Sequence, residues 1–222
     1  LLIGGGMAST FQLAAAGSGL GYMEYFYPGI VVMMVLFASI FGTITVIEDR
    51  HEGFLQSVLT GPGSRASVVI GKSLGVGSVG LIQSALFICF APAAGFAFGD
   101  VNWVMLITFL VLGALALASF GFALAWWIDS SQGYHAVMSI LLLPAWVLSG
   151  AMFPVSGKSA VLDALMQYKP MSYLVSGTRR AFYVDVPPGT TVGASVWVDL
   201  AVVAGFCLFS VALATRLCYR RR

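Results

Sequence analysis

The chain has 222 residues, of which 59% are hydrophobic and only 9% are charged, and its mean hydropathy is +0.94. A soluble domain carries about 25% charged residues, so this composition excludes a water-soluble fold and makes lipid the solvent for most of the chain. The formal net charge of +2 is too small to indicate a nucleic-acid partner, and the three cysteines fit neither a disulfide framework nor a zinc site.

The first residues, 1–6, are apolar and resemble the end of a membrane span, and a loop follows at 7–27. The chain opens on Leu1 and Leu2, without Met and without the basic start of a signal peptide. We therefore expect it to be a fragment that lacks its true N-terminus and most of a first span.

Long stretches without charge predict five complete spans. Four stretches contain no Asp, Glu, Lys or Arg, namely 25–47, 73–99, 101–128 and 130–157. A fifth, 193–215, is charged only at Asp199. About 20 helical residues cross the hydrocarbon, where a helix satisfies its own backbone polar groups. The predicted fold is an all-α polytopic bundle with spans at 28–47, 70–94, 103–127, 135–153 and 194–215.

The charged loop at 48–69 predicts a short amphipathic helix, which Gly61-Pro62-Gly63 would end. The apolar face of this helix would contain Ile47, His51, Phe54, Leu55, Val58 and Leu59. The polar face would contain Asp49, Glu52 and Gln56. Helices that lie on lipid favour Lys and Arg on the polar face, so this acidic face favours a protein partner over the membrane surface.

The next span begins with a near-match to a phosphate-binding loop, Ala66–Ser73. Ala66 stands where that motif needs its first Gly, and no βαβ pattern surrounds it. Lys72 is therefore interpreted as an anchor whose ammonium reaches the lipid interface. Gly71, Gly75 and Val79 share one face of this span, and such small residues allow helices to approach closely, inside the bundle rather than between subunits.

Residues 154–193 are apolar at helical spacing, but Pro170 and Pro187 divide the segment into pieces too short to cross. We predict two short helices partly embedded at the outer interface. Candidate residues for the outer mouth are Lys169, Tyr173, Arg179 and Arg180. The two Arg guanidinium groups are expected at lipid headgroup level, where they could steer an exiting amphipathic substrate; simple anchoring is the alternative.

The basic residues predict the orientation, because Lys and Arg are more frequent in cytoplasmic loops. With the 48–69 loop inside, seven basic residues are cytoplasmic: Arg50, Arg65, Lys72, Arg216, Arg220, Arg221 and Arg222. Four remain outside: Lys158, Lys169, Arg179 and Arg180. Aromatic belts then place Trp103 and Trp197 at the outer interface and Trp126 and Trp127 at the inner one.

The order of these features resembles the type-2 ATP-binding-cassette (ABC) permeases, which include drug, polysaccharide and nodulation-factor exporters. In this family a span that begins with Pro-Gly leads to an acidic, Gly-containing cytoplasmic helix and then to Gly-Lys. The similar residues here are Pro28-Gly29, Glu48–Gly53, Gly61–Arg65, Gly71-Lys72, Ser149-Gly150, Phe153-Pro154, Pro170–Tyr173 and Arg179. One departure is Lys169, where the family usually has Asn.

The resemblance implies one ABC type-2 transmembrane domain over 1–222, with six spans in the intact subunit and the first one truncated here. It implies two separate ATPase subunits and a second permease copy, as a homodimer in lipid. ATP and Mg would bind the ATPase subunits, and this chain would hold no cofactor, metal or catalytic residue. The residues implied to couple to the ATPase are Glu48, Asp49, Arg50, Glu52, Gly53, Phe54 and Leu55.

The function implied is ATP-driven export of an amphipathic, drug-like, lipid-linked or glycan substrate across a bacterial inner membrane, with the C-terminus cytoplasmic. Two alternatives remain open, a membrane assembly protein without transport and an intramembrane enzyme. The enzyme would need a polar catalytic cluster inside the spans, and the sequence contains no such cluster, no His-Glu-x-x-His motif and no nucleophile elbow. The acidic loop helix counts against an assembly protein.

Overall fold

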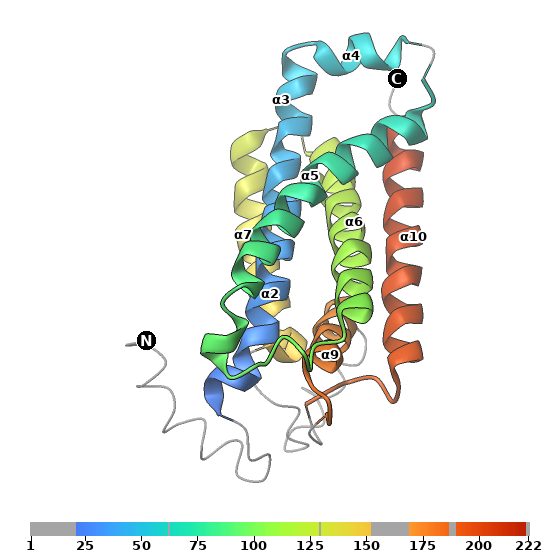
Figure 1. Cartoon of the computed structure of the whole chain (residues 1–222). Helices are drawn as coiled ribbons and strands as arrows, with labels where there is room; N and C mark the ends of the chain where they lie inside the picture. The colour runs from blue at the N-terminus through green and yellow to red at the C-terminus, as the bar shows by residue number, and fades with distance from the viewer. Residues whose placement is uncertain (1–20, 62, 129, 152–168, 187–189, 221–222) are drawn as a thin grey trace. The chain divides into compact units, whose positions relative to one another are not determined.

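The computed structural model describes residues 21–61, 63–128, 130–151, 169–186 and 190–220. Over these residues the chain is helical and forms no strand, which confirms the predicted all-α membrane fold (Figure 1). The longer helices are α2 (Tyr22–Phe41), α5 (Arg65–Ile88), α6 (Trp103–Trp127), α7 (Ser131–Trp146), α9 (Pro170–Phe182) and α10 (Val196–Arg220). The shorter ones are η1 (Gly42–Ile44), α3 (Thr45–His51), α4 (Phe54–Leu59), η2 (Ala91–Ala94) and η3 (Val147–Ala151).

Five helical stretches among the described residues are long and apolar enough to cross a membrane: Met23–His51, Arg65–Ile88, Trp103–Trp127, Ser131–Ala151 and Val196–Tyr219. Each overlaps one of the five predicted spans. The first is longer than predicted because α2 continues through η1 into α3, so that the charged residues from Glu48 to His51 belong to the same helical rod.

The chain divides into two compact units. Among the described residues, the first unit contains those up to Met33, those of Ser84–Leu110 and those of Pro144–Val203. The second unit contains Met34–Gln83, Val111–Leu143 and those from Ala204 onward. Each of the five long helical stretches contributes residues to both units, so each unit is itself a small helical bundle.

Close packing in the second unit depends on Gly77 and Gly80 of α5 and not on the predicted Gly71 and Gly75, where an added Cβ would meet no atom within 4 Å. A Cβ on Gly80 would lie 3.3 Å from Ala38 Cβ on α2, and one on Gly77 would lie 3.4 Å from Ala114 Cβ on α6. Tyr134 of α7 is fully buried, and its hydroxyl pairs with Thr43 Oγ1 at 2.6 Å. In membranes such packing and interhelical hydrogen bonds hold helices together, because lipid provides no hydrophobic drive between them.

The first unit has an aromatic core and two backbone-level contacts. The Tyr27 ring packs against Phe87, Phe96 and Phe182 at centroid distances of 4.9, 5.7 and 5.7 Å. Gly29 of α2 faces Ala151, and a Cβ added to Gly29 would lie 2.9 Å from Ala151 Cβ. The Gly29 carbonyl accepts a hydrogen bond from Trp146 Nε1 at 3.0 Å. Only glycine allows α2 to approach η3 this closely.

Two sequence predictions about the ends of the helices need correction. The predicted continuous helix over 48–59 is broken: α3 ends at His51, and α4 begins at Phe54. Trp126 is buried in the protein rather than placed in an aromatic belt, whereas Trp103, Trp127 and Trp197 are exposed. Trp126 is buried because its ring stacks on Phe122, one helical turn away, at a centroid distance of 5.7 Å.

Of the two predicted outer helices, the second is α9, and the first lies outside the described residues. The 13 residues of α9 reach about 20 Å, less than the roughly 30 Å of hydrocarbon, so this helix is too short to cross. Lys169 before it is extended, with φ −97° and ψ 123°, and Pro170 starts the helix.

Candidate functional site

The first candidate site is the bend between α3 and α4, which we call the elbow (residues 51–54). Gly53 has a φ of +77°, a left-handed backbone conformation that residues with a Cβ rarely adopt. The Gly53 amide donates to the Arg50 carbonyl at 3.3 Å, which closes the last turn of α3. Gly53 therefore ends α3 and redirects the chain into α4.

The elbow separates residues that a continuous helix would have placed on one face. The Phe54 side chain is 60% exposed, whereas Leu55 is only 5% exposed and belongs to the core. Glu48 and Glu52 are also exposed. We call the three exposed side chains, Glu48, Glu52 and Phe54, the elbow patch. It combines one large apolar group with two carboxylates.

The side chains of α3 next to the patch bond to other helices of the same unit. The Asp49 carboxylate forms an ion pair with Lys72 of α5. Arg50 donates from Nη1 to the Trp126 carbonyl at 3.1 Å and from Nη2 to the Ile128 carbonyl at 3.0 Å. These oxygens lie at the C-terminal end of α6, where carbonyls lack helical partners and a positive charge is favourable.

Lys72, which was predicted to be an anchor at the lipid interface, also has a protein partner in Asp49. Arg65, in the first turn of α5, likewise donates to the Cys218 carbonyl of α10 at 2.6 Å and lies over the Tyr219 ring at 5.0 Å. Basic side chains on α3 and α5 therefore link the elbow directly to α5 and α6, and α5 in turn to α10.

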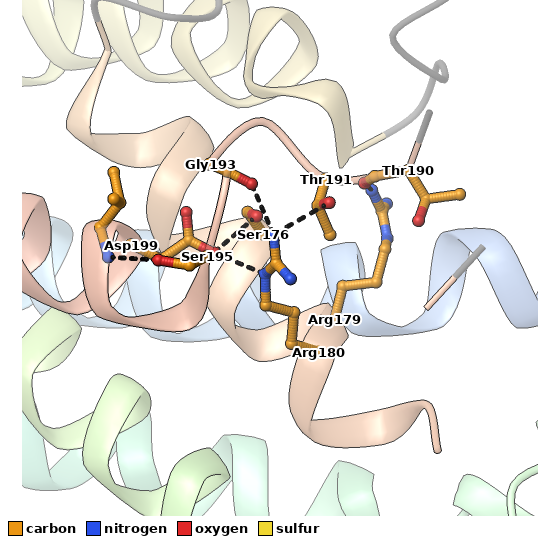
Figure 2. Close-up of polar contacts among 9 residues, drawn as sticks. Ser176, Arg179, Arg180, Thr190, Thr191, Gly193, Ser195 and Asp199 are labelled. Atoms are coloured by element: carbon orange, nitrogen blue, oxygen red, sulfur yellow. Dashed lines mark hydrogen bonds and ion pairs between the residues drawn. The ribbon is translucent and has the colours of Figure 1, made fainter. Parts of the chain in front are cut away.

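The second candidate site contains Ser176, Arg179, Arg180, Thr190 and Asp199, which Figure 2 shows, together with Tyr25, whose carbonyl accepts from Arg179. We call it the outer polar cluster, after the side of the membrane that the sequence predicts for it. Arg179 of α9 is 1% exposed. Its guanidinium donates to the Thr190 carbonyl and, from Nη2, to the Tyr25 and Gly150 carbonyls at 3.2 and 3.3 Å. It also lies 4.0 Å from the centre of the Tyr25 ring, a cation–π contact.

Arg180 occupies the other side of the cluster (Figure 2). Its Nε donates to Asp199 Oδ2 at 2.9 Å, and its Nη2 donates to Thr191 Oγ1 at 3.2 Å and to the Gly193 carbonyl. Ser176 donates to the same Asp199 oxygen at 2.8 Å. Asp199 is fully buried, so this pair joins α9 to the first turn of α10.

The two guanidinium groups, which were predicted at lipid headgroup level, point into the protein and not toward lipid. The Arg179 guanidinium bonds to backbone carbonyls inside the protein, and Arg180, with 17% of its side chain exposed, bonds to Asp199. A buried guanidinium is costly without such partners, which explains why both point inward. Lys169 and Tyr173, the other outer-mouth candidates, are half-buried at the start of α9.

Sequence reasoning missed four members of this cluster: Tyr25, Ser176, Thr190 and Asp199. Asp199 carried the only usable signal, because it is the single charge in an otherwise uncharged span and such residues need a partner. Next to the cluster, the Tyr183 hydroxyl donates to the Glu24 carbonyl at 2.8 Å. Burial raises the pKa of Tyr183 above its ordinary value, so the hydroxyl stays protonated and keeps donating.

Within the described ranges, no group of three His, Cys, Asp or Glu side chains could hold a metal ion. The elbow patch offers exposed contacts for a partner, and the outer polar cluster offers fixed bonds among α2, η3, α9 and α10. The first arrangement is suited to binding a partner, and the second to holding α9 in place.

Comparison with known proteins is consistent with this geometry. Residues 8–216 match the family described as ABC-2 family transporter protein. The chain is 26% identical over 160 residues to the putative transport permease ycf38 of Cyanophora paradoxa, and this alignment covers 71% of the chain and 55% of ycf38. It is 25% identical over 188 residues to the inner membrane transport permease YadH of Escherichia coli K12, covering 80% of this chain and 70% of YadH.

A third relative is nodulation protein J of Sinorhizobium fredii, which is 25% identical over 210 residues. That alignment covers 91% of this chain and 76% of nodulation protein J. The chain thus spans between about half and three quarters of the length of these relatives.

Proposed function

The chain belongs to the ABC-2 transporter family, and from this membership we propose that it is the membrane-spanning permease subunit of an ABC exporter. It would move an amphipathic, drug-like, lipid-linked or glycan substrate outward, across a bacterial inner membrane. The hydrolysis of ATP would take place on separate ATPase subunits, which would also bind the Mg. The relatives ycf38 and YadH, both named as transport permeases, support this proposal.

The observation that carries the proposal is the elbow patch. Phe54 is a large apolar side chain that is exposed beyond the end of α3, at a bend that Gly53 holds in place. Glu48 and Glu52 precede it in the chain and are exposed, and their carboxylates make the patch unsuited to an anionic lipid surface. An aromatic anchor with a polar, charged rim is typical of protein–protein contacts. The occupant we propose is an ATPase subunit with an apolar pocket and a basic rim.

Asp49 and Arg50 give this contact a mechanical connection to the membrane helices. Because Asp49 pairs with Lys72 and Arg50 bonds to the end of α6, a displacement of α3 would act on α5 and α6 in the same unit. We propose that closure of two ATPase subunits on ATP moves the elbows of two permease copies. Such a rigid-body switch between two packed states would open a path outward.

The outer polar cluster would have a supporting role. Arg179 and Arg180 hold α9 against Tyr25, Gly150 and Asp199 through bonds that leave little freedom. We propose that α9 forms a fixed wall of the outer mouth, on which half-buried Lys169 and Tyr173 would meet the departing substrate.

The proposal is tested by Phe54→Ala, made in the permease co-expressed and reconstituted with an ABC ATPase subunit from the same genome that the wild-type permease binds. Loss of such an anchor typically costs about 2 kcal/mol or more, so ATP hydrolysis by the complex should lose its dependence on the permease. The matched control is Phe209→Ala on α10, because Phe209 is 59% exposed and lies away from the elbow patch. Wild-type coupling in the Phe54 variant would remove the elbow from the mechanism.

A further inference from the structure

A groove runs along the surface of the second unit, between the α2–α3 rod and α5. Its volume is about 380 Å³, and its lining includes Ala38, Gly42, Thr45, Lys72, Gly75 and Val79. Most of the side chains that line the groove are small and apolar. A Cβ added at Gly75 would meet no atom within 4 Å, so this part of the groove is open space.

The charged end of the groove coincides with the boundary between uncharged and charged sequence. The uncharged run of the first span ends at Ile47, and that of α5 begins at Ser73. Asp49 and Lys72 lie just beyond these two positions and form an ion pair in which the side chains are 22% and 28% exposed. Since charged side chains avoid the hydrocarbon, this pair marks the headgroup level of one leaflet.

The length of the groove favours a lipid chain over a helix. From Lys72 to Val79 the helix rises about 10 Å at 1.5 Å per residue. One leaflet contributes about 15 Å of hydrocarbon, whereas a neighbouring spanning helix would lie along α5 for about 30 Å. A groove that starts at headgroup level and ends within the same leaflet has the dimensions of an acyl chain.

We propose that this groove binds one glycerophospholipid with a phosphoethanolamine headgroup. The Lys72 ammonium has three donors, of which Asp49 takes one, so others remain for the lipid phosphate. The Asp49 carboxylate has acceptor sites for the lipid ammonium. The Lys72 ammonium thus pairs with the lipid phosphate and the Asp49 carboxylate with the lipid ammonium. One acyl chain lies along Gly75 and Val79 toward Ala38.

The headgroup chemistry makes the proposal specific. Phosphatidylcholine has the same charges, but its quaternary ammonium has no N–H to donate to Asp49. Phosphatidylglycerol offers a phosphate to Lys72 but no cation to Asp49. The ethanolamine lipid is the one of the three that satisfies both side chains.

The test is native mass spectrometry of the full chain released from nanodiscs made of equal parts of the three lipids with identical acyl chains. One ethanolamine lipid should stay bound in preference to the other two. Lys72→Gln should weaken its retention about tenfold, as expected for one charge-assisted hydrogen bond. Gly75→Leu should abolish retention by filling the groove, and Gly205→Leu on α10, which is equally open, should leave it unchanged.

Equal retention of the ethanolamine and choline lipids would overturn the proposal. So would unchanged retention in both the Lys72 and the Gly75 variants. A change from dimer to monomer mass caused by Gly75→Leu alone would assign the groove to a second copy of the chain instead. None of these measurements depends on ATP or on an ATPase subunit, so the result is independent of the proposed transport function.

Discussion

Arg179 shows at the scale of one residue how this protein tolerates a buried charge. Its guanidinium is planar and has five donors, and its partners come from three separate parts of the chain: Tyr25 at the start of α2, Gly150 at η3, and Thr190 before α10. No lysine could reach all three, because an ammonium is a compact point charge. The side chain therefore acts as a structural link inside the first unit.

Arg179→Met should lower the melting temperature of the purified protein in detergent by roughly 5 °C. The substitution leaves the buried Thr190 carbonyl without this donor, and one such loss costs about 2 kcal/mol. Arg179→Lys should lower the melting temperature by nearly as much. The control is Arg216→Met, because Arg216 is exposed, and it should change little. An unchanged melting temperature in Arg179→Met would show that the bonds to Arg179 contribute nothing.

At the scale of elements, α9 and α6 approach so closely that glycine is required at their contact. A Cβ on Gly177 would lie 2.2 Å from Cε1 of Phe109, and the next two atoms of that ring would be at 2.3 and 2.6 Å. Phe109 is itself fully buried, so its ring has no space into which to move. The position of α9 in the first unit therefore depends on Gly177 as much as on the polar cluster.

Gly177→Ala should destabilise the protein by about 1–3 kcal/mol through overpacking, measured as chemical unfolding in mixed micelles. Phe109→Leu in the same chain should restore part of that loss, since it removes the ring that the new methyl meets. Gly205→Ala is the matched control. Its added methyl has open space, so it should be neutral or slightly stabilising within a helix. Additive effects of the Gly177 and Phe109 changes would refute the contact.

The elbow is the element for which sequence reasoning was least complete. Apolar spacing placed Leu55 and Phe54 on one apolar face, of which Leu55 is buried and Phe54 is exposed, because the spacing joined α3 and α4 into one helix. The pattern could not reveal the break, because glycine is compatible with a helix and becomes a stop only when its φ turns positive. Phe54 consequently leaves the face that it would share with Leu55.

At the scale of the whole molecule, the spans were predictable and the polar contacts were not. Lipid requires about 20 uncharged residues in each crossing, a constraint that acts on every residue of a span and therefore shows in the sequence. The partners of Arg179, Arg180 and Lys72 depend on which helices lie side by side. Single residues such as Asp199 indicate that a partner exists but do not identify it.

The identity of the protein that touches Phe54 tests the central claim most directly. A photocrosslinking amino acid at position 54 of the permease, activated in intact cells, would be followed by mass spectrometry of the covalent product, with position 209 as the matched control. Our account predicts that position 54, and not 209, joins a subunit that contains the phosphate-binding loop G-x-x-x-x-G-K-[ST]. Crosslinks from position 54 to lipid alone, or to proteins without that loop, would contradict it.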